Sequence, residues 1–380
     1  MATKPRSIFE EVDSARKPAT APGGIDRGGR GGARRAIRAW LVVLFALVWI
    51  MIIVGGLTRL TDSGLSITEW APLSGAIPPV SAEAWQAEFD AYRAIPEYEL
   101  QNAGMSLAEF KRIFWWEWGH RQLGRVIGLV WGAGYLWFAL RRQIPAGWHI
   151  RLAIPGLLGG VQAAIGWGMV HSGLQEGRVD VASYWLALHL GTAFVILGLI
   201  AWYAFALSRK EAALMQARRQ GEGKLFSLTT GLMHFAFLQI VLGALVAGID
   251  AGRAFPTWPL MGDGFLPPEP FGITPWFVNF WENAGLVQFL HRMSGYLLLA
   301  FGVVVWLRGR RVANRRTAFA VNAALAALLV QIVLGIVTVL YSAQWHVAIT
   351  HQGVAVLLWV LILRARFLAR YPLPQSVRDT

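Results

Sequence analysis

Cysteine is absent from this 380-residue chain, and charged residues make up only 15% of it. Without cysteine the chain can form no disulfide, no thiolate metal site and no covalent c-type haem attachment, so any metal must be bound by histidine or carboxylate. With 55% hydrophobic residues beside so little charge, the chain has too much apolar surface to close into an ordinary soluble globule. These two shortages predict an integral membrane protein without thiol chemistry.

Several stretches are long and apolar enough to cross the hydrocarbon core of a bilayer, which takes about 20 mostly apolar residues. The eight predicted spans lie near Ala36–Leu57, His120–Leu140, Ile150–Val170, Tyr184–Leu207, Leu225–Gly248, Gln288–Leu307, Thr317–Tyr341 and Trp345–Leu368. The predicted fold class is therefore an all-α integral membrane protein with eight transmembrane helices.

The net charge of +13 is compatible with a nucleic-acid partner, but the basic residues lie in short segments between the apolar spans rather than in one stripe. We therefore expect membrane lipid around the chain and no nucleic acid. Basic residues crowd both ends of the chain and every second connection, whereas the long connections 61–119 and 249–287 are acidic or nearly neutral. By the positive-inside rule, both termini face the cytoplasm and the two long connections face outward.

The two halves of the chain repeat the same landmarks in the same order, which indicates a duplication. The matching pairs are Gly55–Gly64 with Gly243–Gly252, His120–Gly124 with His291–Gly295, Val161–Gly166 with Val330–Gly335, and Leu188–Gly191 with Thr350–Gly353. Because each half holds four spans, an even number, both halves enter the membrane in the same direction. The repeat predicts two pseudo-symmetric four-helix bundles side by side.

The domain boundaries follow from these spans and from a Gly/Arg/Ala-rich start that has no apolar core. Glu10, Glu11 and Asp13 in that segment argue against a mitochondrial transit peptide. The predicted order is a disordered cytoplasmic tail (1–35), an N-terminal four-helix bundle (36–208), a cytoplasmic linker (209–224), a C-terminal four-helix bundle (225–370) and a C-terminal tail (371–380).

Four of the eight histidines recur at matching positions, on the second and fourth span of each half. They are His120, His189, His291 and His351. By the predicted topology each lies within about two turns of the outward-facing end of its helix, so each bundle holds two histidines at one depth, as the two axial ligands of one haem require. A helix-end histidine bonded to a carbonyl is a common alternative, but it does not explain two matching pairs. A zinc or non-haem iron site usually needs more ligands, so haem iron is the favoured metal.

The residues around the first histidine of each bundle suit a flat macrocycle. One turn later stands a glycine, Gly124 or Gly295, on the helix face where a larger side chain would block the ring. Arginines follow the same histidines near the polar boundary, where haem propionates need cationic partners. We expect Arg121, Arg125 and Arg292 to contact the propionates.

The two halves differ one turn before these histidines. Glu117 stands three residues before His120, whereas Gln288 stands three residues before His291. An electron-transfer haem needs no acid or base, but oxygen activation and hydroxylation need protons. We therefore expect catalysis in the N-terminal half, with Glu117 as the catalytic residue, and electron supply in the C-terminal half. The alternative is that Glu117 is simply a carboxylate favoured near a helix start by the macrodipole.

Three long motifs resemble those of haem A synthases. They are Gly55–Trp70, Glu109–Arg121 and Phe289–Gly295. The resemblance covers essentially all eight spans, and the lack of cysteine is typical of the cysteine-free type seen in alphaproteobacteria and mitochondria. It implies an oxidoreductase of the bacterial inner membrane, with its haem sites toward the periplasmic face. Such an enzyme oxidises the C8 methyl of haem O to a formyl group by successive oxygen-dependent hydroxylations, giving haem A for terminal oxidases.

The resemblance also implies which residues hold which haem. Haem b, the cofactor, would lie between His291 and His351, and the substrate haem O between His120 and His189, with Glu117 essential nearby. Molecular oxygen, haem O synthase and an unidentified electron donor would be the partners. Two other classes remain open: a di-haem b-type electron-transfer cytochrome would use the same histidine pairs, and a haem transporter would suit parallel repeats. Glu117 and the long outer loops favour the enzyme.

Overall fold

The computed structural model describes residues 30–375, and within that range eight helices are long and apolar enough to cross a membrane. They are α1 (Arg30–Leu60), α4 (Leu107–Leu140), α5 (His149–Gly173), α6 (Ser183–Leu207), α8 (Gly223–Gly248), α11 (Ala284–Gly309), α12 (Arg315–Leu340) and α13 (Trp345–Arg370). Between 30 and 375 no strand occurs, so the eight predicted spans and the all-α class are confirmed. The predicted terminal tails lie mostly outside the described residues.

Short helices lie in the connections. They are α2 (Ala82–Arg93), α3 (Pro96–Leu100), α7 (Glu211–Arg219), α9 (Ala251–Ala254), α10 (Asn279–Glu282) and the 3₁₀ turns η1 (Ser74–Ala76) and η2 (Trp276–Val278). The predicted linker 209–224 therefore contains the helix α7.

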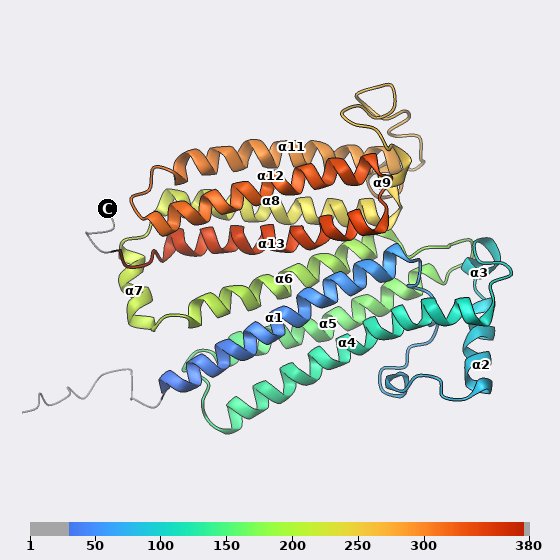
Figure 1. Cartoon of the computed structure of the whole chain (residues 1–380), viewed down its shortest axis with the longest axis horizontal. Helices are drawn as coiled ribbons and strands as arrows, with labels where there is room; N and C mark the ends of the chain where they lie inside the picture. The colour runs from blue at the N-terminus through green and yellow to red at the C-terminus, as the bar shows by residue number, and fades with distance from the viewer. Residues whose placement is uncertain (1–29, 376–380) are drawn as a thin grey trace, which may run out of the picture.

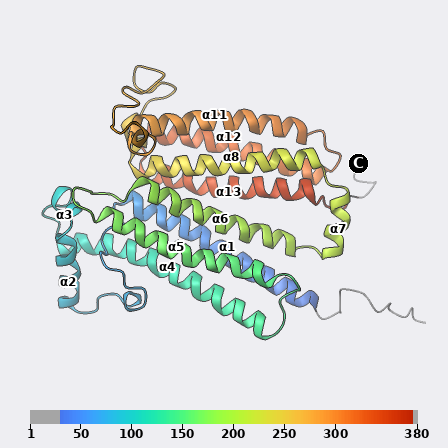
Figure 2. The ribbon, with the colours of Figure 1, turned by 180° about the vertical axis from the view of Figure 1, so that it is seen from behind.

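The long helices form two groups of four that lie side by side (Figure 1). Helices α1, α4, α5 and α6 contact one another, as do α8, α11, α12 and α13, and the groups meet where α6 packs on α8 and α13 and where α1 packs on α13 (Figure 2). This arrangement fits the two bundles that the repeat predicts. The start of α1 and the end of α13 lie opposite the end that carries α2, α3 and α9 (Figure 1), as an even number of spans requires.

The charged flank of α1 is helical from Arg30, inside the segment predicted as a tail. The reason is a contact with the end of α6, whose last carbonyls have no partner within their own helix. Arg34 donates from Nη2 to the carbonyls of Ala206 and Arg209 at 3.2 and 2.6 Å, and Arg38 donates to the carbonyl of Ala204 at 3.2 Å. These arginines therefore stabilise the ends of both helices.

Arg59, near the C-terminal end of α1, joins the two halves at the end that carries α2, α3 and α9. Its guanidinium lies 3.0 Å from Asp62 of its own half, 3.0 Å from Asp250 at the end of α8, and 3.4 Å from Asp180. The Arg59 side chain is only 12% exposed, so these ion pairs are less screened than surface pairs. In the second half, the position that matches Arg59 is Ala247.

Helix α4 begins at Leu107, well before the predicted start at His120. Ser106 and Glu109 form a reciprocal capping box at its first turn. The extra turns carry Phe110, which is fully buried and packs against Phe89 of α2 with ring centroids 5.1 Å apart. The connection between α1 and α4 therefore folds into an aromatic cluster on the first turns of α4, at one end of the helices, which we call the outer cluster (residues 81–114).

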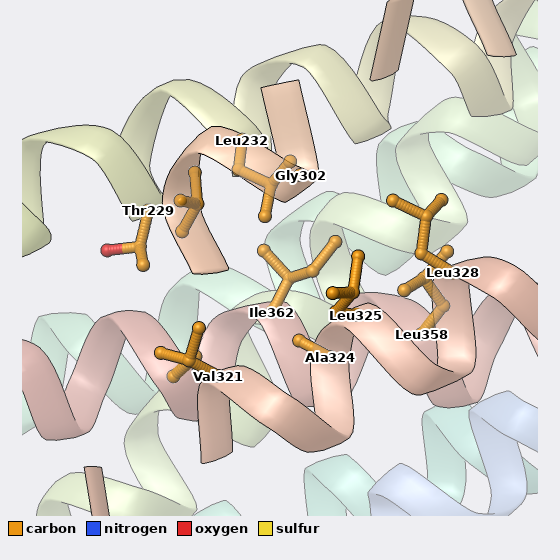
Figure 3. A pocket seen from close by; sticks show the side chains of 11 residues that line it. Thr229, Leu232, Gly302, Val321, Ala324, Leu325, Leu328, Leu358 and Ile362 are labelled. Atoms are coloured by element: carbon orange, nitrogen blue, oxygen red, sulfur yellow. The ribbon is translucent and has the colours of Figure 1, made fainter. Parts of the chain in front are cut away.

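An apolar pocket lies between α8, α11, α12 and α13 in the C-terminal bundle (Figure 3). Aliphatic side chains such as Leu232, Leu328 and Ile362 line it, and the one hydroxyl group in the lining, that of Thr229, donates to the carbonyl of Leu225 in its own helix. The lining includes no histidine, so the histidine sites lie elsewhere in the bundle.

Glu97 of α3 is buried in the outer cluster, with 3% of its surface exposed. The Tyr92 hydroxyl donates to its Oε1 at 3.4 Å, while Oε2 is buried without a hydrogen-bond partner among the described residues. Burial, followed by the negative charge of Asp180, raises the pKa of Glu97 to about 8. The carboxyl group is therefore mainly protonated at neutral pH.

We expect the outer cluster to lose stability as the pH rises from 4.5, the ordinary pKa of a glutamate, to about 8. Over that range the folded chain holds a proton on Glu97 that the unfolded chain has released, so rising pH favours unfolding. Glu97→Gln keeps an acceptor for Tyr92 but cannot ionise, so its stability should not fall over this range. Hydrogen exchange of the outer cluster at pH 6 and pH 9, corrected for intrinsic rates, measures the difference. Glu99→Gln, an exposed position on the same helix, should behave like the parent; identical pH profiles for the parent and Glu97→Gln would contradict the prediction.

Candidate functional site

The first histidine pair comes together between α4 and α6. The rings of His120 and His189 have centroids 6.5 Å apart and planes inclined by 71°. With metal–nitrogen bonds of about 2 Å, a metal ion bonded to both rings would set the centroids about 6 Å apart. The pair therefore has the spacing that two axial ligands of one iron need.

The second pair lies at the matching place in the C-terminal half. His291 of α11 and His351 of α13 occupy the positions that match His120 and His189, and each ring lies against a glycine of a neighbouring helix, Gly243 or Gly335. Within residues 30–375 no group of three or more histidine, cysteine or acidic side chains is placed to hold a metal ion. Two ligands suffice for haem but fall short of a typical zinc site, so the donor set fits haem.

Three of the four histidines lie within two turns of the start of their helices. His189 follows Ser183 by six residues, His291 follows Ala284 by seven, and His351 follows Trp345 by six. His120 lies thirteen residues after Leu107, so the prediction of two turns is wrong for it. The capping box and the aromatic packing of the outer cluster lengthen α4 outward, while the 6.5 Å spacing of His120 and His189 keeps the pair at one depth.

A glycine of a neighbouring helix lies against each imidazole ring. A β-carbon placed on the glycine would come within 3.3 Å of ring atom Cε1 in every case: 3.3 Å for Gly55 with His120, 2.9 Å for Gly166 with His189, 3.0 Å for Gly243 with His291, and 3.1 Å for Gly335 with His351. Carbon atoms separated by less than about 3.5 Å repel one another. Glycine therefore provides the space in which each ring sits, and we call these four residues the cradle glycines.

Glutamines from neighbouring helices hold three of the histidines. Gln239 of α8 donates from Nε2 to the carbonyl of His291 at 2.9 Å, and the same nitrogen lies 3.1 Å from Nδ1 of that ring. Gln331 of α12 donates to the carbonyl of His351 at 3.0 Å and lies 3.3 Å from both ring nitrogens. Gln162 of α5 donates only to the backbone carbonyl of His189, at 2.8 Å.

Several polar atoms of these sites are buried without a partner among the described residues. They are Oε1 of Gln162, Gln239 and Gln331 and Nδ1 of His189. Buried polar groups in proteins are nearly always hydrogen-bonded, so a cluster of unpaired ones indicates a site completed by a group outside the chain. Together with the cradle glycines, these atoms support haem binding by both histidine pairs.

Glu117 anchors the loop that follows α1. Its Oε2 accepts from the Ser66 hydroxyl and from the backbone N–H of Ile67, both at 2.8 Å. Its Oε1 accepts from Nε and Nη2 of Arg121 at 3.1 and 2.6 Å. Arg121 also donates to the carbonyls of Ile67 and Glu69. The carboxylate therefore has a structural task in addition to any chemistry it performs.

The second half anchors its own loop with a neutral group. The Gln288 amide donates to the carbonyl of Ala251 at 2.8 Å, and its oxygen accepts from Arg292 at 3.1 Å. Arg292 also donates to the carbonyls of Phe255 and Leu260. The difference between Glu117 and Gln288 is thus one charge at matching loop anchors.

The arginines predicted to meet propionates are largely occupied by loop carbonyls. Arg125 donates to the carbonyls of Ala71 and Pro72, and Arg121 and Arg292 are bonded as described above. Their contact with propionates stays a prediction. Gly124 and Gly295 face side chains of neighbouring helices, and their contact with a porphyrin likewise stays a prediction.

Sequence reasoning missed the residues that support the ligands. The missed residues are the cradle glycines Gly55, Gly166, Gly243 and Gly335 and the glutamines Gln162, Gln239 and Gln331. All four glycines and two of the glutamines recur in the repeat. The repeat could therefore have pointed to these residues, although it does not say what they do. The mid-span His234 bonds through Nδ1 to the carbonyl of Thr230 in its own helix at 2.9 Å.

Comparison with known proteins gives one consistent result. Residues 38–363 match the model of a family described as cytochrome oxidase assembly protein. Proteins named haem A synthase from Ruegeria pomeroyi and another Ruegeria species are 65% and 64% identical, each over 98% of this chain and 99% of its own length. A haem A synthase from Paracoccus denitrificans is 60% identical over 99% of both chains.

We expect Gly335→Val to weaken binding of the C-terminal haem about 10–100-fold, the usual effect of disturbing the support of a metal ligand. The added side chain would push the His351 ring away from the position that glycine allows. Titration of the purified protein with haem, followed by absorbance, measures the affinity. Gly128→Val is the matched control, because a β-carbon there meets nothing within 4 Å. Equal affinity in the two variants would show that the glycine does not position the ring.

Proposed function

This chain belongs to the cytochrome oxidase assembly protein family and is an oxidoreductase that converts haem O into haem A, and we propose that its two histidine pairs divide that work. His120 and His189 would hold the substrate haem O, and His291 and His351 would hold a haem b cofactor, which would supply electron transfer. The observation that carries this division is the pairing of two similar sites, of which only the first has a carboxylate one helical turn before its first ligand.

The haem groups, when bound, supply electron transfer and the activation of molecular oxygen that oxidises the C8 methyl. The chain supplies orientation and protons. The cradle glycines fix where the rings stand, and Glu117 is the acid–base group closest in sequence to a ligand. Its Oε2 accepts from the Ser66 hydroxyl, which also contacts the carbonyl of Ser63. Both partners of this hydroxyl are acceptors, so Ser66 shares its one hydrogen between them and holds the Glu117 carboxylate in place.

The rival classes are less well supported. A di-haem electron-transfer cytochrome needs no charged group at Glu117, and a haem transporter needs no fixed pair of axial ligands in each half. Full-length relatives named haem A synthase favour the enzyme over both.

The multi-pass chain is best placed in the bacterial inner membrane, with both termini in the cytoplasm and both histidine pairs toward the periplasm. Three of the ligands lie in the first turns of helices that begin at the end carrying α2, α3 and α9 (Figure 1), and the basic connections lie at the other end. Molecular oxygen, an electron donor and haem O synthase, as the source of substrate, complete the proposal.

We expect His351→Ala to remove the low-spin bis-histidine haem spectrum while the protein still inserts, because the pair that would hold haem b keeps only His291. Extraction of the pigments from the parent protein should yield haem O and haem A beside haem B. Haem B alone in the parent would favour a plain cytochrome, and full haem B in His351→Ala would contradict the assignment of the cofactor site.

We expect Glu117→Gln to lower haem A formation about 10²–10⁴-fold, the typical worth of acid–base assistance, with haem O or a partly oxidised product accumulating. Membranes that contain the variant and haem O synthase would be analysed for all three haems, with haem B content as the measure of folding.

Ser66→Ala is the matched control, because it removes one hydrogen bond from the anchor and leaves the carboxylate in place. If a loss of haem A in Glu117→Gln reflects only a weakened loop anchor, haem B falls with it, and Ser66→Ala shows the same joint loss. If it handles protons, Glu117→Gln keeps haem B and loses haem A. Wild-type haem A in Glu117→Gln would reject the catalytic role.

A further inference from the structure

We propose that Met51 makes His120 a releasable ligand, so that the first site exchanges its haem while the glutamines of the second site hold theirs. This proposal rests on the division of the two sites set out above, and it concerns how two similar sites come to keep or release a haem. It assigns Met51, Gln239 and Gln331 as positioning residues.

Met51 and Gln239 occupy the same place in the two halves. Met51 stands eleven residues before Asp62, and Gln239 stands eleven residues before Asp250, the matching aspartate of the repeat. Their side chains also fill matching space. The Met51 methyl lies 3.4 Å from a β-carbon placed on Gly124, and the Gln239 amide nitrogen lies 3.4 Å from one placed on Gly295.

The second half has the Gln239 amide where the first half has the Met51 thioether. The first half therefore lacks a hydrogen-bond donor beside its ligand His120. Gln239 donates to the backbone of His291 and places the same nitrogen 3.1 Å from the ring. A thioether has no donor and only a weak acceptor, and its unbranched chain adapts readily to its surroundings. Accordingly, no side chain in residues 30–375 hydrogen-bonds to the His120 ring.

The contrast extends to the other ligand of each pair. Gln331 places its amide nitrogen 3.3 Å from both ring nitrogens of His351. Gln162 reaches only the carbonyl of His189, whose Nδ1 is buried without a partner. Both rings of the second site therefore have an amide beside them, and neither ring of the first site does.

This asymmetry matches the tasks of the two sites. A substrate site must bind haem O and release haem A in every cycle, whereas a cofactor site must keep its haem through many cycles. Groups that orient a metal ligand typically change metal affinity by about 10–100-fold. Each ring of the second site has an amide beside it, and neither ring of the first site does. The second site should therefore hold its haem longer than the first.

The test is an exchange of these side chains in the full-length protein, loaded with haem O and haem B in detergent. Apomyoglobin in excess captures released haem, and absorbance follows the loss from each site. His120→Ala and His351→Ala identify which phase belongs to which site. We expect the parent to lose haem in a fast phase from the first site and a slow phase from the second.

Met51→Gln should slow the fast phase about 10–100-fold, Gln239→Met should speed the slow phase by a similar factor, and the double exchange should reverse the order of the sites. Met233→Gln places the same polar group elsewhere on α8 and should leave both phases unchanged. Unaltered phases in Met51→Gln and Gln239→Met would overturn the proposal.

Two outcomes are kept apart by design. If neither histidine variant removes a phase, the proposed haem sites themselves are wrong. If both phases are assigned but do not respond to the exchange, only the role of Met51 and the glutamines fails. Should Gln239→Met not insert, Gln331→Met tests the same claim at the other cofactor ligand, and an unchanged slow phase there would overturn it.

Discussion

An imidazole ring needs room between two helices packed inside lipid, and in each site that room comes from a missing side chain. The cradle glycines let α1, α5, α8 and α12 approach the histidine helices so closely that a β-carbon would lie 2.9–3.3 Å from the ring. Helix association in membranes depends on such close packing, since lipid provides no hydrophobic driving force between helices. The spacing of His120 and His189, and hence any binding of one iron by both, depends on this contact.

The helix turn that carries the first ligand of each half also holds the outer loop. Residues three before and one after the histidine, Glu117 with Arg121 or Gln288 with Arg292, bind the loop backbone. The loop and the ligand histidine are therefore attached to the same helix turn. If the loop lost its contacts with this turn, the position of the histidine would also be disturbed. Glu117 anchors its loop with a charged carboxylate, whereas the neutral amide of Gln288 suffices for the same task in the other half.

The sequence predicts the all-α class, the eight spans, the four paired histidines and the family, because apolar runs and repeated motifs are local signals. The length of α4 was missed because the aromatic contacts of Phe110 form only after folding. The loop carbonyls that Arg121 and Arg125 bind could not be predicted, because they carry no sequence pattern. The role of Met51 could not be predicted for a different reason, because a methionine in a transmembrane span is common. Its importance follows only when its match to Gln239 in the repeat is combined with the contacts of both side chains.

Arg59 serves the aspartates of both halves, Asp62 and Asp250, while the position that matches Arg59 in the second half is Ala247. Two copies of the first half would bring two arginines to the junction, and two copies of the second would bring aspartates with no arginine from that position. The ion pairs at this junction are therefore one-sided: a single arginine of the first half neutralises an aspartate of each half, and the second half returns no charge from the matching position.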